Sequence, residues 1–152
     1  MDFVKLRKFL SDDYIILLIG LNKKQCVSLP KGIIGIERTN NIRELAEYYS
    51  IAEVFVNPTW EDTFPTTNLE ALACGTPVVT YRTGGSPEAI SSETGFVVEQ
   101  GDLEGVVAAI KEISFKGKSF YSQACRNRAI QNFNKIDRYQ EYIELYKKIL
   151  NN

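Results

Sequence analysis

Short apolar runs rich in β-branched residues alternate with helical patterns along this chain, and that alternation restricts its fold more than any other feature. Residues 14–19 form a continuously apolar run, as expected for a strand covered on both faces. Alternating strands and helices are typical of a parallel sheet with helices on both sides, so we expect a doubly wound, Rossmann-like α/β/α fold in three layers. The expected strands are 14–19, 33–36, 54–56, 78–81 and 96–98.

Capping signals locate the helices between these strands. Asn41, with Glu44 three residues later, predicts a capping box at a helix start. Ser86 is predicted as the N-cap of a short helix with Pro87 at its first position, and Asp102 as the cap of a longer one. The expected helices are 3–10, 22–28, 41–50, 65–74, a short one from 86, 102–113, 120–133 and 137–150.

The length of 152 residues is that of one ordinary domain. We therefore expect a single Rossmann-like domain over residues 1–152, with 137–150 as its C-terminal helix. A formal net charge of −1 provides no basic excess to neutralise a phosphate backbone, which argues against a nucleic-acid partner. The chain has no histidine, and this excludes His-based triads, His metal ligands and His proton relays.

Cysteine usage and hydropathy bear on the compartment. The three cysteines, Cys26, Cys74 and Cys125, are widely spaced and odd in number, so they indicate reduced thiols rather than a disulfide set or a metal site. The longest apolar run, 15–19, is far shorter than the roughly 20 residues of a spanning helix. We expect a cytoplasmic protein.

The densest polar segment lies between the third strand and the next helix. Ligands of open parallel sheets bind beyond the carboxyl ends of the strands, where this segment is expected. Free backbone amides around Thr66 and Thr67 at the helix start would attract a phosphate. Asp62 and Glu70 would flank that start with carboxylates, which accept hydrogen bonds from sugar hydroxyls. Equally, Glu70 could be a solvated helix residue and Asp62 a loop or cap residue.

The next loop, 81–88, also contains residues that could contact a ligand. Its adjacent glycines, Gly84 and Gly85, allow either a close backbone approach to a ligand or a tight turn. Arg82 could contact a phosphate or remain solvated, and the sequence leaves both open.

The motifs of these loops together carry a family resemblance. Residues 58–90, PTWEDTFPTTNLEALACGTPVVTYRTGGSPEAI, resemble the donor-binding, C-terminal half of the retaining glycosyltransferases of family 4, which have the GT-B fold. The family signature is an acid, seven intervening residues and a glutamate, followed by E-A-x-A-C/A-G-x-P-V-V and a G-G-x-P-E turn. Asp62 and Glu70 have that spacing. The similarity extends from about Ile33 to the C-terminus.

This resemblance implies a role for each matching position. Glu70 would bind the ribose hydroxyls of a UDP- or GDP-sugar, and Asp62, the candidate catalytic residue, would contact the donor hexose. The sugar and pyrophosphate would be held by the amides of Phe64, Pro65, Thr66 and Thr67. The nucleobase would lie at Gly35, Ile36, Glu37 and Arg38. Family members need no metal, so the resemblance implies that this protein uses no cofactor and no metal, and that the nucleotide sugar is a substrate.

The chain departs from the family pattern in two respects. Asp62 replaces the usual first glutamate, as in family members with an Asp-x-Phe-Pro version. The family's N-terminal, acceptor-binding domain and the first strand of the present domain are expected to be absent. We therefore expect donor binding without turnover, with a glycan or lipid-linked acceptor bound by the absent domain. The intact hexosyltransferase would act in surface polysaccharide synthesis, peripherally at the inner face of the cell membrane.

Two other functions remain open. A non-enzymatic doubly wound interaction module would treat Asp62, Glu70 and the glycine pair as ordinary surface. A sugar-nucleotide epimerase of the same GT-B architecture would release nucleotide without an acceptor. Separately, the aromatic stripe of residues 137–150 predicts core packing, and any part left exposed would favour self-association.

Overall fold

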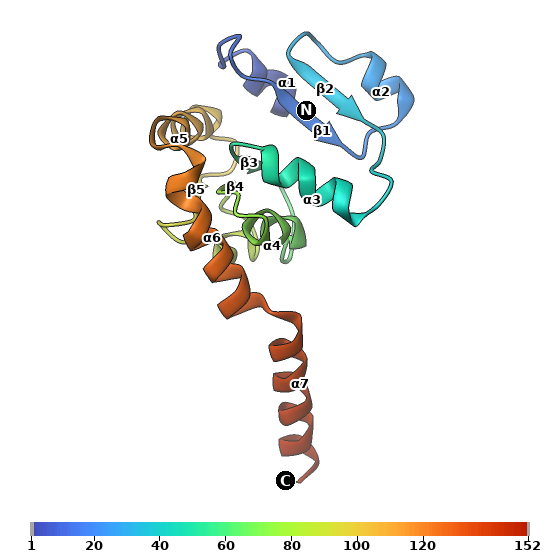
Figure 1. Cartoon of the computed structure of the whole chain (residues 1–152), viewed down its shortest axis with the longest axis vertical. Coiled ribbons are helices and arrows are strands. Elements are labelled where there is room, and N and C mark those ends of the chain that lie inside the picture. The colour runs from blue at the N-terminus through green and yellow to red at the C-terminus, as the bar shows by residue number, and fades with distance from the viewer. Residues whose placement is uncertain (1, 152) are drawn as a thin grey trace.

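The computed structural model describes residues 2–151, and these form parallel strands with flanking helices (Figure 1). The elements in chain order are α1 (Asp2–Arg7), β1 (Ile16–Ile19), α2 (Lys23–Val27), β2 (Ile33–Ile36), α3 (Ile42–Ile51), β3 (Phe55–Asn57), α4 (Thr66–Ala73), β4 (Val78–Tyr81), the 3₁₀ helix η1 (Ser86–Ala89), β5 (Gly95–Val98), α5 (Leu103–Lys116), α6 (Lys118–Phe133) and α7 (Lys135–Leu150). The predicted α/β fold with parallel strands is confirmed.

The strands pair as two separate parallel sheets. Strand β1 pairs with β2, and the second sheet has the order β3-β4-β5. In the register of the second sheet, Val56 lies opposite Val79 and Val79 opposite Phe96. Within the described residues, each sheet has two outer edges without a strand partner, which belong to β1 and β2 in one sheet and to β3 and β5 in the other. The β3-β4-β5 sheet therefore positions the loops in which the candidate site lies.

Strand β4 lies at the centre of the core. All four of its residues are buried, and successive side chains of a strand point to opposite faces, so both faces of this sheet are covered. Helix α5 packs against β4 and β5, while α4 packs against β3 and β4 and contacts α3 and α6. This is the three-layer arrangement that the alternating sequence predicts.

The capping predictions have mixed outcomes. Asn41 and Asp102 are N-caps, since their side-chain oxygens accept hydrogen bonds from the backbone N–H groups of Glu44 and Gly105, respectively. The side chain of Glu44 bonds to the backbone of Asn40 instead of closing the predicted box on Asn41. The prediction for Ser86 was wrong: Gly85 is the cap residue, and Ser86 is the first residue of the 3₁₀ turn.

Strand β1 is less covered than a continuously apolar run predicts. Leu18 is buried, whereas Leu17 and Ile19 are each 36% exposed and Ile15, just before the strand, is 67% exposed. The reason is that alternate side chains of β1 point away from the packed face, and β2 is the only strand beside it in residues 2–151.

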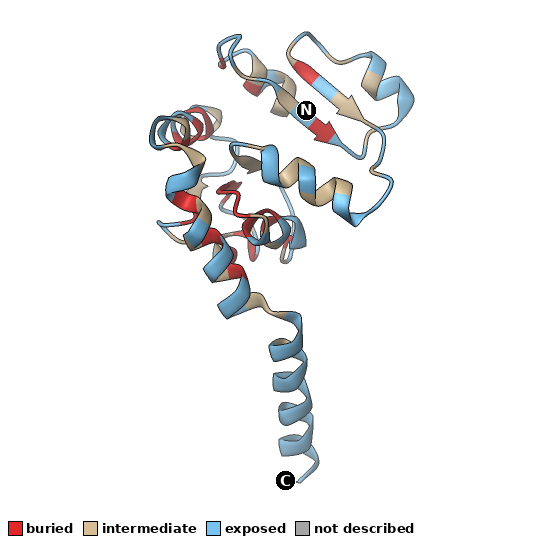
Figure 2. Cartoon of the chain, in the orientation of Figure 1, coloured by how far each residue is buried: buried red, intermediate tan, exposed pale blue. Residues whose placement is uncertain are grey.

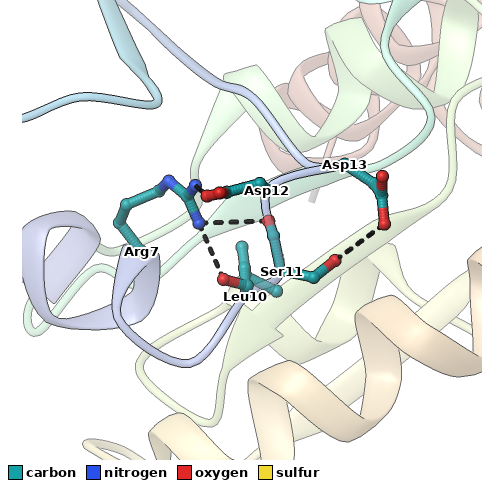
Figure 3. Close-up of polar contacts among 5 residues, drawn as sticks. All are labelled: Arg7, Leu10, Ser11, Asp12 and Asp13. Carbon is teal, nitrogen blue, oxygen red and sulfur yellow. Dashed lines mark hydrogen bonds and ion pairs between the residues drawn. The ribbon is translucent and has the colours of Figure 1, made fainter.

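A guanidinium closes the turn between α1 and β1 (Figure 3). Arg7 donates to the backbone oxygens of Leu10 and Ser11, at 2.7 and 3.1 Å, and to the Asp12 carboxylate at 2.8 Å. The Arg7 side chain is only 11% exposed, and its bonds tie the end of α1 to the carbonyl groups of the loop that leads into β1. Arg7 thereby fixes the entry of the chain into β1.

The predicted core packing of the C-terminal stripe was wrong. Helix α7 projects away from the body of the molecule and has no buried residue (Figures 1 and 2). The exposed apolar side chains of α7 are Ile136, Tyr139, Tyr142, Ile143, Leu145, Tyr146, Ile149 and Leu150. Self-association through this face stays a prediction. Over residues 2–151, no helix has the length and apolar character needed to cross a bilayer.

We expect Gly32→Ala to destabilise the fold strongly. Gly32 has φ +87° and a Cβ there would overlap Nε of Arg7, whose hydrogen bonds hold it in place. The positive φ costs about 1–2 kcal/mol, and the overlap adds about 1–3 kcal/mol. Gly20→Ala is the control, since Gly20 has φ +95° with no atom within 4 Å of an added Cβ. Urea unfolding of both variants measures the difference, and equal losses would contradict the role given to Arg7.

Candidate functional site

The site lies where β3 ends and α4 begins. The connecting loop, 58–65, carries Asp62, and Glu70 lies one turn into α4. Parallel strands of one sheet present their carboxyl ends at the same edge, so this loop lies beside the loop that follows β4. Asn57, the last residue of β3, donates from Nδ2 to Oδ1 of the fully buried Asn68 at 2.9 Å and so ties the strand end to α4.

The start of α4 has free donors. Its N-cap is Pro65, no side chain caps it, and the first backbone N–H with an acceptor in the described residues is that of Asn68. Thr66 and Thr67 are exposed, so their amides are available to an anion. The predicted set of four amides needs correction. Pro65 has no N–H, and the N–H of Phe64 already donates to Oδ1 of Asp62 at 3.0 Å.

An open pocket of about 440 Å³ is lined by Glu61, Asp62, Thr63, Thr83 and Gly84. Of the predicted site residues only Asp62 lines it, and Thr66, Thr67 and Glu70 do not. The pocket exists because two loops pack backbone against backbone. Gly85 donates its N–H to the carbonyl oxygen of Thr63 at 2.8 Å. A Cβ at Gly84 would overlap the carbonyl of Asp62, so the glycine pair allows the close approach of the protein's own loop.

Glu70 has a partner that sequence reasoning missed. The hydroxyl of Tyr49, on α3, donates to Oε2 of Glu70 at 3.0 Å. Burial, followed by the charge of Glu70, raises the pKa of Tyr49 above its usual range, so this hydroxyl stays protonated. No local pattern could reveal the pair, because 21 residues separate its members.

Trp60 is a second residue that the sequence did not single out. Its carbonyl oxygen accepts from Oγ1 of Thr83 at 2.9 Å and from Nε2 of Gln100 at 2.6 Å, while its ring packs edge-on against Tyr81. These contacts join the Asp62 loop to the chain on both sides of β5. The nearby Arg82 pairs with Glu99 at 2.8 Å and remains largely exposed.

The four residues expected at the nucleobase lie at the end of β2 and directly after it. Gly35 and Ile36 belong to β2, which is in the other sheet, and Glu37 and Arg38 are exposed after it. A Cβ at Gly35 would overlap Leu29 and crowd Cys26, so packing under α2 accounts for this glycine. None of the four lines the pocket beside Asp62. Across residues 2–151, no three His, Cys, Asp or Glu side chains are grouped as a metal site would require.

Residues 3–114 match the family model described as glycosyl transferases group 1. The chain belongs to that family. A curated relative, the α-maltose-1-phosphate synthase of Mycobacterium tuberculosis, is 32% identical over 127 residues. That match covers 78% of the present chain and 33% of the relative, so the chain spans about a third of the length of this synthase.

Solved structures agree on the fold. A glycosyltransferase from Rickettsia africae superposes with a TM-score of 0.82 at 24% identity, covering 98% of this chain and 44% of that one. Anabaena Alr3699/HepE, in a crystal structure with UDP, superposes with a TM-score of 0.80 at 18% identity, covering 95% and 44%. At these identities the likeness concerns the fold alone, and it confirms the expected GT-B type of α/β architecture.

We expect Gly84→Ala to disrupt the pocket. Gly84 has φ +46° and no room for a Cβ against the backbone of Asp62, so the two loops must separate. Strain at one such position costs about 1–3 kcal/mol. Gly101→Ala is the control, because Gly101 has φ +83° but an added Cβ would meet Trp60 only at 3.4 Å. Chemical unfolding of both variants tests this, and a Gly84→Ala loss no larger than the control's would contradict the loop packing.

Proposed function

We propose that this chain is the donor-binding domain of a retaining, metal-independent glycosyltransferase of family 4, and that it binds a nucleoside-diphosphate sugar. The observation that carries the proposal is the uncapped start of α4, with the free amides of Thr66 and Thr67, between the carboxylates of Asp62 and Glu70. Family membership and the UDP of the Anabaena structure support a UDP-sugar, and a GDP-sugar is the alternative donor.

Each group at this site suits one part of the donor. The amides of Thr66 and Thr67, at the positive end of the α4 dipole, suit the pyrophosphate. The exposed carboxylate of Glu70 suits the two ribose hydroxyls, which donate hydrogen bonds. Asp62 has one oxygen engaged by Phe64, and the other suits a hexose hydroxyl beside the pocket. We place the nucleobase near residues 35–38, as the family resemblance implies.

The α4 start would also contribute to the chemistry of the complete enzyme. When the bond between the sugar and the nucleotide breaks, negative charge develops on the departing phosphate oxygen. Donors already aimed at that position lower the barrier without having to reorganise. We assign this role to the amides of Thr66 and Thr67.

The rest of the reaction is proposed to need more than these 152 residues. The curated relative described above is about three times as long as its matched region, and we place binding of a glycan or lipid-linked acceptor in such additional chain. The present chain is proposed to bind donor without turnover. Synthesis of a surface polysaccharide at the inner face of the cell membrane is the pathway context that we propose for the complete enzyme.

Calorimetric titration of the chain with UDP, GDP and ADP tests the donor site. We expect one of these nucleotides to bind selectively. Glu70→Ala should lower the affinity for that nucleotide by tenfold or more, since a hydrogen bond to a charged group is worth roughly 1.5–3 kcal/mol. Glu47→Ala, which removes the same charge from an exposed position on α3, is the matched control and should leave affinity unchanged.

Two results would contradict this proposal. If Glu70→Ala and Glu47→Ala bound the nucleotide as tightly as the unaltered chain, the site would lie elsewhere. If no nucleotide bound, the proposal would fail for this chain and the interaction module would be favoured.

A further inference from the structure

Glu70 is exposed, but its carboxylate is not free to move as an exposed glutamate normally is. Its Oε2 accepts a hydrogen bond of 3.0 Å from the hydroxyl of Tyr49, which lies on a different helix. An unrestrained glutamate side chain would lose conformational entropy when a ligand fixes it. A partner that holds the carboxylate beforehand removes part of that cost, which is the principle of preorganisation.

Tyr49 is itself firmly held. Its ring is half-buried against the core and packs edge-on against Phe55, with the ring centres 5.3 Å apart. Its carbonyl oxygen accepts from Oγ1 of the fully buried Thr76 and from Nζ of Lys118. Lys118 also donates to the carbonyl oxygen of Ser50, at the C-terminal end of α3, where a cation interacts favourably with the last carbonyls. Burial lowers the pKa of Lys118 from its usual value. The hydroxyl of Tyr49 therefore has a fixed position above α4.

The Tyr49–Glu70 bond leaves acceptor capacity on the Glu70 carboxylate. A carboxylate has about four lone-pair sites on its two oxygens, and Tyr49 occupies one of them on Oε2. The second oxygen, Oε1, remains available to vicinal hydroxyls. Because Tyr49 stays protonated at neutral pH, it acts on Glu70 only as a donor.

We infer that Tyr49 is a positioning residue that holds the Glu70 carboxylate toward the ribose hydroxyls, so that discrimination between a ribonucleotide and one lacking those hydroxyls depends on it. This inference rests on the proposed donor function. It assigns to Tyr49 no contact with the nucleotide. Its effect must pass through Glu70 and must concern the ribose alone.

The experiment compares UDP with 2′,3′-dideoxyuridine diphosphate by calorimetry, on the unaltered chain and on Tyr49→Phe, Glu70→Ala and the double variant. Tyr49→Phe removes one oxygen and keeps the ring that packs on Phe55. We expect Tyr49→Phe to lower the affinity for UDP by roughly three- to tenfold, which corresponds to the loss of about one hydrogen bond. The affinity for the dideoxy nucleotide should not change. The double variant should bind UDP no more weakly than Glu70→Ala.

Tyr48→Phe is the matched control, since Tyr48 precedes Tyr49 on α3, is also half-buried, and points to a different side of the helix. Unchanged UDP affinity in Tyr49→Phe, together with a loss in Glu70→Ala, would overturn the inference and leave the donor site standing. Equal weakening of both nucleotides by Tyr49→Phe would also overturn it, because that result indicates a general structural role. Failure of the unaltered chain to bind UDP, GDP or ADP would instead overturn the donor function itself.

Discussion

The fully buried strand β4 is the constraint on which the rest of the structure depends. Its side chains are enclosed on both faces, and its two backbone edges pair with β3 and β5 in parallel register. That register brings the loops after β3 and β4 to one edge of the sheet. There the backbone of Gly84 and Gly85 packs directly on residues 62 and 63. The pocket beside Asp62 follows from this approach of two loops, which larger residues in place of the glycines would prevent.

Local signals in the sequence predicted the elements well where one residue type decides the outcome. Strands 33–36 and 78–81 have the predicted bounds, because Gly and Pro limit them on one side. Asn41 and Asp102 cap helices as expected, since their side chains compete for free amides. Ser86 failed as a cap because Gly85 already begins the turn and Pro87 is compatible with either the first or the second helical position.

Tertiary relations were beyond the sequence alone. Its alternation predicted parallel strands and flanking helices, but not the division into two sheets, nor that α7 would lie outside the core. At the site, Asp62, Glu70 and the start of α4 could be found from spacing and family resemblance. The Tyr49–Glu70 and Asn57–Asn68 hydrogen bonds could not, because each joins two separate elements and depends on how those elements pack. The candidate site residues are thus close together in sequence, whereas Tyr49, the partner of Glu70, comes from a different helix.

We propose that the start of α4 receives the phosphates of a nucleotide. Amide signals in a ¹⁵N–¹H correlation spectrum, followed as UDP is added, test this proposal at the level of single residues. We expect saturable shifts that are largest for Thr66 and Thr67, the free donors of α4. Shifts confined to β1, α2 and β2, or a spectrum without saturable change, would contradict it.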